Sequence, residues 1–146
     1  MPVSLSEASI DYGKFRESLC RLEEQHEVFS QGDPYWSINV QEGMAESVIQ
    51  RFETCYDCLW KVLRRYLILE LGIPSVPNSP KPVFRLASEN LVLPSPVEQW
   101  LRYANARIDT SHDYDGEKAQ ACLLVVPTFI ADAIQLYVSM SRATWE

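Results

Sequence analysis

The chain has 146 residues and a formal net charge of −7, from 13 Lys and Arg against 20 Asp and Glu, and 47% of its residues are hydrophobic. This length predicts one domain spanning residues 1–146, with enough apolar residues to fill a core. The negative charge excludes a protein that coats nucleic acid non-specifically, because such binding depends on neutralising many phosphates. Any contact with nucleic acid is therefore expected at a local basic site.

The cysteines and the N-terminus indicate the compartment. Four scattered cysteines are too few for a disulfide scaffold, which predicts reduced thiols (Cys20, Cys55, Cys58 and Cys122). Residues 1–11 lack the basic segment and apolar run of a signal peptide, and we find no apolar stretch of about 18 residues. We therefore expect a cytoplasmic protein with no membrane contact.

The first half of the chain predicts two helices. The first spans residues 9–30 and carries apolar residues along one side, and residues 31–39 form a loop. In the second, from 48 to 71, apolar residues recur at alternating steps of four and three, as in helical bundles. Asn39 and Glu42 are a plausible capping pair for its start, and Gly72 ends it.

The second half predicts three more helical segments. Ser79-Pro80 suits the start of a short helix towards residue 89, and Ser95-Pro96, with Glu98 completing a capping box, opens a helix towards Arg107. A last helix runs from 116 to 142 and is expected to kink at Pro127. No stretch alternates with the period of two of a strand. The expected fold is therefore all-α, an antiparallel bundle of four or five helices.

Residues 107–114 form the densest polar cluster in the chain and are expected at the junction between two helices. Arginine binds phosphate through two parallel hydrogen bonds, and histidine, with a pKa of about 6.5, transfers protons near neutral pH. From the spacing alone, a solvated helix end whose cations favour the helix dipole explains the cluster equally well.

Three segments in matching order resemble the HEPN family, whose members pair with minimal nucleotidyltransferases. The first is the pattern of Arg107, four residues, His112, one residue and Tyr114. The others are residues 51–67 and residues 79–87. Together they cover most of the chain from 48 to 114.

The resemblance implies a helical bundle that forms a homodimer or a higher homo-oligomer, bringing two copies of the Arg107/His112 segment into one cleft. It implies a metal-independent ribonuclease that cleaves RNA, either endo- or exonucleolytically, as the toxin of a toxin–antitoxin pair. The antitoxin is then a minimal nucleotidyltransferase that silences the toxin by adding AMP to Tyr114. In other members the same domain is a non-catalytic subunit that binds a nucleotide or substrate, and this alternative stays open.

The chemistry of metal-free RNA cleavage assigns roles to the motif. His112 acts as general base or acid, one histidine from each subunit of the dimer, and Arg107 stabilises the phosphate and the transition state. Asp109 and Ser111 are candidate orienting residues. Ile108 departs from the family pattern, in which a polar residue, often asparagine, follows the arginine. That residue commonly helps to orient the site, so the departure argues against cleavage unless Asp109 takes its place.

Other features have a structural and a functional interpretation. Lys61 and Arg64 are expected either to contact phosphate at the edge of the cleft or to belong to a charged helix flank. A zinc site at Cys55 and Cys58 would need two further ligands, so buried thiols are favoured and no metal or cofactor is expected. His26 is expected to be a partly buried structural residue.

Two remaining patterns concern aromatic residues and transferase chemistry. The tryptophans are interpreted as core or interface residues rather than base-stacking platforms (Trp36, Trp60, Trp100 and Trp145). The chain lacks a Gly-Ser pair followed by Asp-x-Asp, and it lacks a glycine-rich phosphate loop. It is therefore not expected to transfer nucleotides itself.

Overall fold

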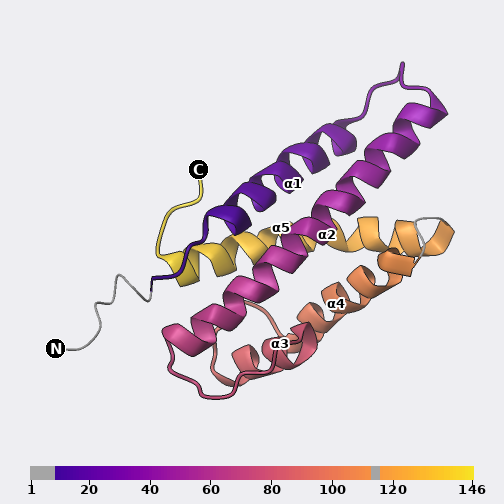
Figure 1. The fold of residues 1–146 in the computed structure, drawn as a ribbon. Coiled ribbons are helices and arrows are strands. Elements are labelled where there is room, and N and C mark those ends of the chain that lie inside the picture. Colours follow the sequence, from indigo (N-terminus) through magenta and orange to yellow (C-terminus); the bar gives the residue numbers. More distant parts are fainter. Residues whose placement is uncertain (1–8, 113–115) are drawn as a thin grey trace.

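The computed structural model describes residues 9–112 and 116–146, apart from the side chains of Ser111 and His112. This part of the chain contains five α-helices and no strand: α1 (Gly13–Gln31), α2 (Ile38–Leu69), α3 (Pro80–Glu89), α4 (Val97–His112) and α5 (Gly116–Ser141) (Figure 1). The predicted all-α bundle is confirmed.

The core forms where α2, the longest helix, packs against the others. α1 and α2 lie antiparallel, α5 contacts α1, α2 and α4, and α3 fills the space between α2 and α4 (Figure 1). The apolar positions that recur on α5 are buried, and so are those of α2 as far as Val62, whereas Leu69 at the end of α2 is 46% exposed. The aromatic rings of the core interlock. Phe129 of α5 lies 4.9 Å from Phe52 of α2 and 5.2 Å from Tyr103 of α4, in edge-to-face contacts. These contacts fix α4 against α2.

Two predicted helix starts differ from the structure. α2 begins after Ser37, whose Oγ accepts a hydrogen bond from the backbone N–H of Val40 at 3.2 Å, so the proposed cap at Asn39 lies too far along the chain. α4 begins at Val97, one residue later than proposed. The hydroxyl of Ser95 instead accepts a hydrogen bond from the buried indole N–H of Trp100 at 2.9 Å. The buried Trp100, five residues later in the chain, has therefore taken the side chain that was expected to cap the helix.

The last helix, α5, has two faces. Pro127 lies inside it on the exposed side, while nine of its residues are buried in the bundle. By length and composition α5 is apolar enough to cross a membrane. This differs from the expectation that the chain has no apolar stretch of about 18 residues. Core helices of globular proteins meet the same two criteria.

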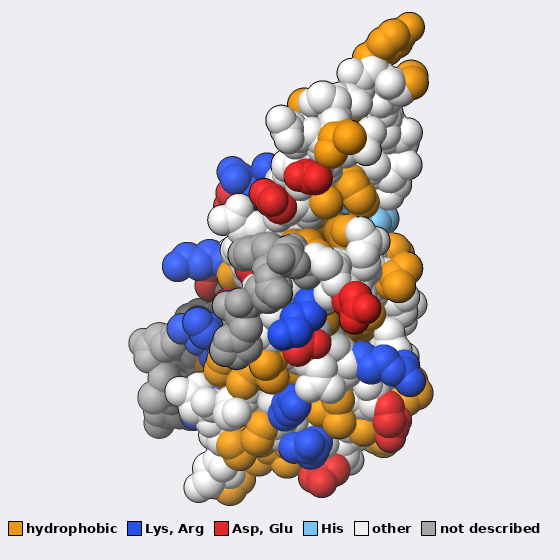
Figure 2. Space-filling model, turned by 90° about the vertical axis from the view of Figure 1, so that its right-hand side faces the viewer, with side chains coloured by type: hydrophobic (Ala, Val, Ile, Leu, Met, Phe, Trp, Pro, Cys, Tyr) orange, Lys and Arg blue, Asp and Glu red, His pale blue; other side chains and the backbone are white. Residues whose placement is uncertain are grey.

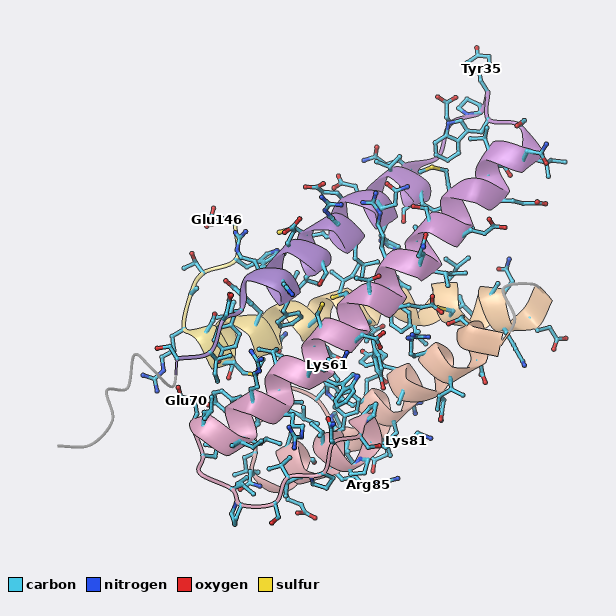
Figure 3. All side chains as sticks on the ribbon, viewed as in Figure 1. Tyr35, Lys61, Glu70, Lys81, Arg85 and Glu146 are labelled. Carbon is cyan, nitrogen blue, oxygen red and sulfur yellow. The ribbon has the colours of Figure 1, made fainter. Side chains whose placement is uncertain are left out.

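The first two helices extend beyond the bundle as a two-helix arm, defined here as residues 23–47. No residue of the arm is buried, and Tyr35, near its tip, is 94% exposed (Figure 3). Figure 2 shows hydrophobic side chains at the projecting end of the molecule. His26 lies in this arm, half-buried and 3.3 Å from the Ser30 hydroxyl, and burial lowers its pKa. This agrees with its interpretation as a structural residue.

The thiols and tryptophans can be compared with their predicted roles. Cys55 is buried in the core, as expected, but Cys58 is not. Cys122 is buried as well, and burial raises its pKa to about 12. Cys20 and Cys58 are half-buried. Trp100 is a core residue, whereas Trp60 is half-buried and borders the groove described below.

Candidate functional site

Arg107 lies inside α4 and points towards α2, where two carboxylates bind its guanidinium. Its Nε and Nη2 donate to the two oxygens of Asp57 at 3.3 and 3.1 Å, and its Nη1 donates to Oε2 of Glu53 at 3.4 Å. The same oxygen of Glu53 accepts a hydrogen bond of 2.7 Å from the hydroxyl of Thr110. We call these four residues the α2–α4 network.

The helical repeat explains the α2–α4 network. Glu53 and Asp57 lie four residues apart on α2, and Arg107 and Thr110 lie three apart on α4, so each pair shares one face of its helix. The Glu53 side chain is only 12% exposed and that of Arg107 is 26% exposed. Charges at this depth need partners, because burial disfavours an isolated ion. The positive charge of Arg107 is therefore balanced by carboxylates in the molecule itself.

A groove of about 750 Å³ lies beside this network, and α2, α3 and α4 form its walls. Its main lining residues come from each helix in turn: Tyr56, Trp60 and Lys61 of α2, Lys81, Pro82 and Arg85 of α3, and Ala104, Arg107 and Ile108 of α4. Asp57 also borders it. This volume lies within the range of about 300–1,000 Å³ found for small-molecule sites.

Three cations of the groove differ from Arg107. Lys61 lies on α2, and Lys81 and Arg85 lie one turn apart on α3, on the side where these helices meet α4 (Figure 3). In the part of the chain that the structure describes, none of the three forms a salt bridge. The ammonium of Lys61 lies 5.9 Å from the centre of the Trp60 ring, a cation–π distance. The groove is therefore locally positive on a chain with a net charge of −7.

Apart from Asp57 and Arg107, the rest of the lining is apolar or neutral. Trp60 is half-buried, Ala104 is buried, and Ile108 is 47% exposed. Tyr56 is buried; this burial, and then the negative charge of Asp57, raise its pKa, so its hydroxyl stays protonated at neutral pH. The groove thus combines an apolar surface with three cations that form no salt bridge among the described residues.

Only some of the residues predicted to form the site line the groove. Arg107 and Lys61 line the groove, and Asp109 is exposed on α4. Arg64 does not line it, because its guanidinium donates to the carbonyl oxygens of Val76 and Pro77 at 3.1 and 3.0 Å. Arg64 therefore holds the connection between α2 and α3.

The end of the motif is only partly described. His112 is the last residue of α4, so Arg107 lies within the helix and not at the expected junction. The side chains of Ser111 and His112, and all of Tyr114, lie outside the described residues. Their predicted roles stay predictions.

Sequence reasoning missed the two cations of α3. The signal was available, since Lys81 and Arg85 are four residues apart directly after the Ser79-Pro80 helix start. This spacing alone does not identify a site, because a cation pair on one helix usually marks a solvated face. Among the side chains that the structure describes, no group of three His, Cys, Asp or Glu is placed to hold a metal ion.

The sequence was compared with known proteins and protein families. No curated protein sequence matches the chain. A family model described as "Nucleotidyltransferase substrate binding protein like" matches residues 10–142, nearly the whole chain, and agrees with the resemblance to HEPN proteins that pair with nucleotidyltransferases. The chain therefore belongs to the nucleotidyltransferase substrate-binding-protein-like family.

Proposed function

We propose that this protein is the nucleotide-binding subunit of a pair with a separate minimal nucleotidyltransferase, and that the nucleotide binds in the groove between α2, α3 and α4. One observation carries the proposal: Lys61, Lys81 and Arg85 gather around a partly apolar groove on an otherwise acidic chain. The single domain, the homodimer and the cytoplasmic location predicted from the sequence form part of the same proposal.

The chemistry of the groove suits a phosphorylated ligand. Lysine and arginine side chains bind phosphate oxygens through charge-assisted hydrogen bonds, which are stronger than neutral ones. Lys81 and Arg85 project from the same face of α3, so both reach one polyphosphate chain. A positive groove on a negative body also concentrates an anionic ligand near its site. The family description supplies the class of partner, since it names a substrate-binding protein of a nucleotidyltransferase.

Calorimetry with ATP and Mg²⁺ tests this proposal directly. The double variant Lys81→Gln/Arg85→Gln should weaken ATP binding about tenfold or more, because it removes two charge-assisted contacts. The matched control is Arg21→Gln/Arg102→Gln, which removes the same charge at exposed positions that do not line the groove. Equal affinities for the parent and both double variants, or no binding to any of them, would contradict the proposal.

A second candidate function is the metal-independent ribonuclease implied by the sequence motif. It is favoured by one observation: Arg107 lines the groove and shares α4 with His112. In this mechanism one His112 takes the proton of the 2′-hydroxyl, which attacks the phosphate, and the His112 of a second subunit protonates the leaving oxygen. Arg107 would then exchange Asp57 and Glu53 for the phosphate. AMP added to Tyr114 by the partner would silence the reaction.

A nuclease assay separates the two candidates. A mixed RNA pool is incubated in a metal chelator with the parent and with His112→Ala. Cleavage by the parent that disappears in the variant supports the ribonuclease. If neither cleaves RNA and ATP still binds, the nucleotide-binding subunit is the function that remains.

A further inference from the structure

We propose that the groove holds the base of a nucleoside triphosphate between Trp60 of α2 and Ile108 of α4, while α3 binds the phosphates. This inference rests on the proposed function and adds a specificity residue. It gives Ile108, the position that departs from the family pattern, a positive role in recognising the base. The starting point is that α3 lines the groove with two cations, whereas α2 and α4 each bring an apolar residue to it, Trp60 and Ile108, beside their charged residues.

Ile108 has the position that this role requires. It lies one residue beyond Arg107 and one turn beyond Ala104, so both Ile108 and Ala104 line the groove from α4. Ile108 is 47% exposed, whereas Ala104 is 1% exposed. The small alanine leaves space beside the larger isoleucine. A flat apolar ligand lying against Ile108 removes its surface from water, which is favourable.

Trp60 provides a second apolar surface of the groove, from α2. Its ring is half-buried and borders the same groove, and the ammonium of Lys61 lies 5.9 Å from the ring centre. Lys61 is exposed, so a base that stacks on this ring replaces a solvated cation whose attraction to the ring is weak at an exposed site. The displaced ammonium remains next to the groove and is free to approach the phosphates. Tryptophan is also an effective stacking surface for every base.

The cations of α3 define where the phosphates lie. Lys81 and Arg85 come from the wall that carries neither Trp60 nor Ile108. A nucleotide with its base between α2 and α4 therefore directs its phosphate chain towards α3. The phosphates should supply the part of the affinity that is common to all nucleotides, and the base should add a part that depends on Trp60 and Ile108.

The test compares ATP with inorganic triphosphate, both with Mg²⁺, by calorimetry. Base–aromatic stacking corresponds to about fivefold to 150-fold in affinity, so Trp60→Leu should weaken ATP binding at least about fivefold. Ile108→Asn should weaken ATP in the same direction, and both variants should keep triphosphate binding within about twofold of the parent. Ile38→Asn is the matched control, because Ile38 is 72% exposed on the arm and does not line the groove.

The outcomes separate this inference from the function on which it rests. If the parent binds ATP and triphosphate equally, and both are weakened by Lys81→Gln/Arg85→Gln, the groove binds phosphate and the base-binding role of Ile108 is overturned. If the parent binds neither compound, the proposed function fails as well. Circular dichroism controls for folding, and ATP-dependent fluorescence quenching that is lost in Trp60→Leu but kept in Ile38→Asn supports the stacking contact.

Discussion

The α2–α4 network should make Arg107 important for stability, independently of any ligand. Replacing it with methionine keeps most of the side-chain volume but removes the guanidinium. Glu53 then loses one of its two described hydrogen-bond donors, and Asp57 loses a bidentate partner. The two carboxylates, four residues apart on α2, also repel each other without the cation between them.

The magnitude follows from the exposure of each group. Hydrogen bonds to charged groups contribute about 1.5–3 kcal/mol when buried, which suits Glu53 with its 12% exposed side chain. The pair with Asp57, whose side chain is 39% exposed, is screened by solvent and contributes about 0.5–1 kcal/mol. We therefore expect Arg107→Met to lower the free energy of unfolding by about 2 kcal/mol. For a chain of this size that corresponds to a decrease in Tm of about 4–8 °C.

Thermal and urea unfolding measured by circular dichroism test this expectation. A double-mutant cycle with Asp57→Asn should give a coupling free energy of about 0.5–1 kcal/mol, since the two groups are in direct contact. Arg107→Lys keeps the charge but not the two parallel bonds, so its Tm should lie between those of the parent and of Arg107→Met. A Tm of Arg107→Met equal to that of the parent would refute the reasoning, and would mean that the carboxylates do not retain Arg107.

Three further predictions concern other parts of the molecule. Phe129→Ala should lower the free energy of unfolding by about 3–5 kcal/mol in urea denaturation, because it leaves a cavity between Phe52 and Tyr103. Arg64→Gln should lower the free energy of unfolding by about 1 kcal/mol, because it removes the hydrogen bonds to the α2–α3 connection, and it should leave ATP affinity unchanged. A large loss of ATP affinity would mean that Arg64 contributes to the site. Burial raises the pKa of the Cys122 thiol from 9.0 to about 12, so the unfolded chain loses this proton first. Stability should therefore fall as pH rises above about 9, and in urea titrations at pH 8 and pH 10 the fall should be smaller for Cys122→Ala.

The predictions about Arg107 and the groove are linked. Because two carboxylates already bind its guanidinium, any phosphate that contacts Arg107 must compete with them. Lys81 and Arg85 face no such competitor in the part of the chain described. ATP binding should therefore depend more strongly on the α3 cations than on Arg107, and measuring Arg107→Met in the same calorimetric series tests that order.

Local patterns in the sequence determined the helices and the family. The alternating steps of four and three on α2 and α5 reflect the helical repeat, so the apolar residues of one face identify the buried side before any partner is known. Ser79-Pro80 marked the start of α3 because proline is favoured in the first turn, where its missing N–H removes no helical bond. Helix ends did not follow as directly, since several nearby polar residues can cap a helix, and Ser95 instead accepts a hydrogen bond from Trp100, which is buried in the core.

The tertiary structure alone decided which charges meet. Arg107 reaches carboxylates some 50 residues away, and the groove collects residues from three helices, so neither follows from spacing within one segment. The sequence also does not show that Arg64 binds the connection between α2 and α3, whereas Lys81 and Arg85 line the groove. The physical reason is that the helical repeat specifies which side chains share a face, whereas the rotation and crossing of the packed helices determine which face each one meets.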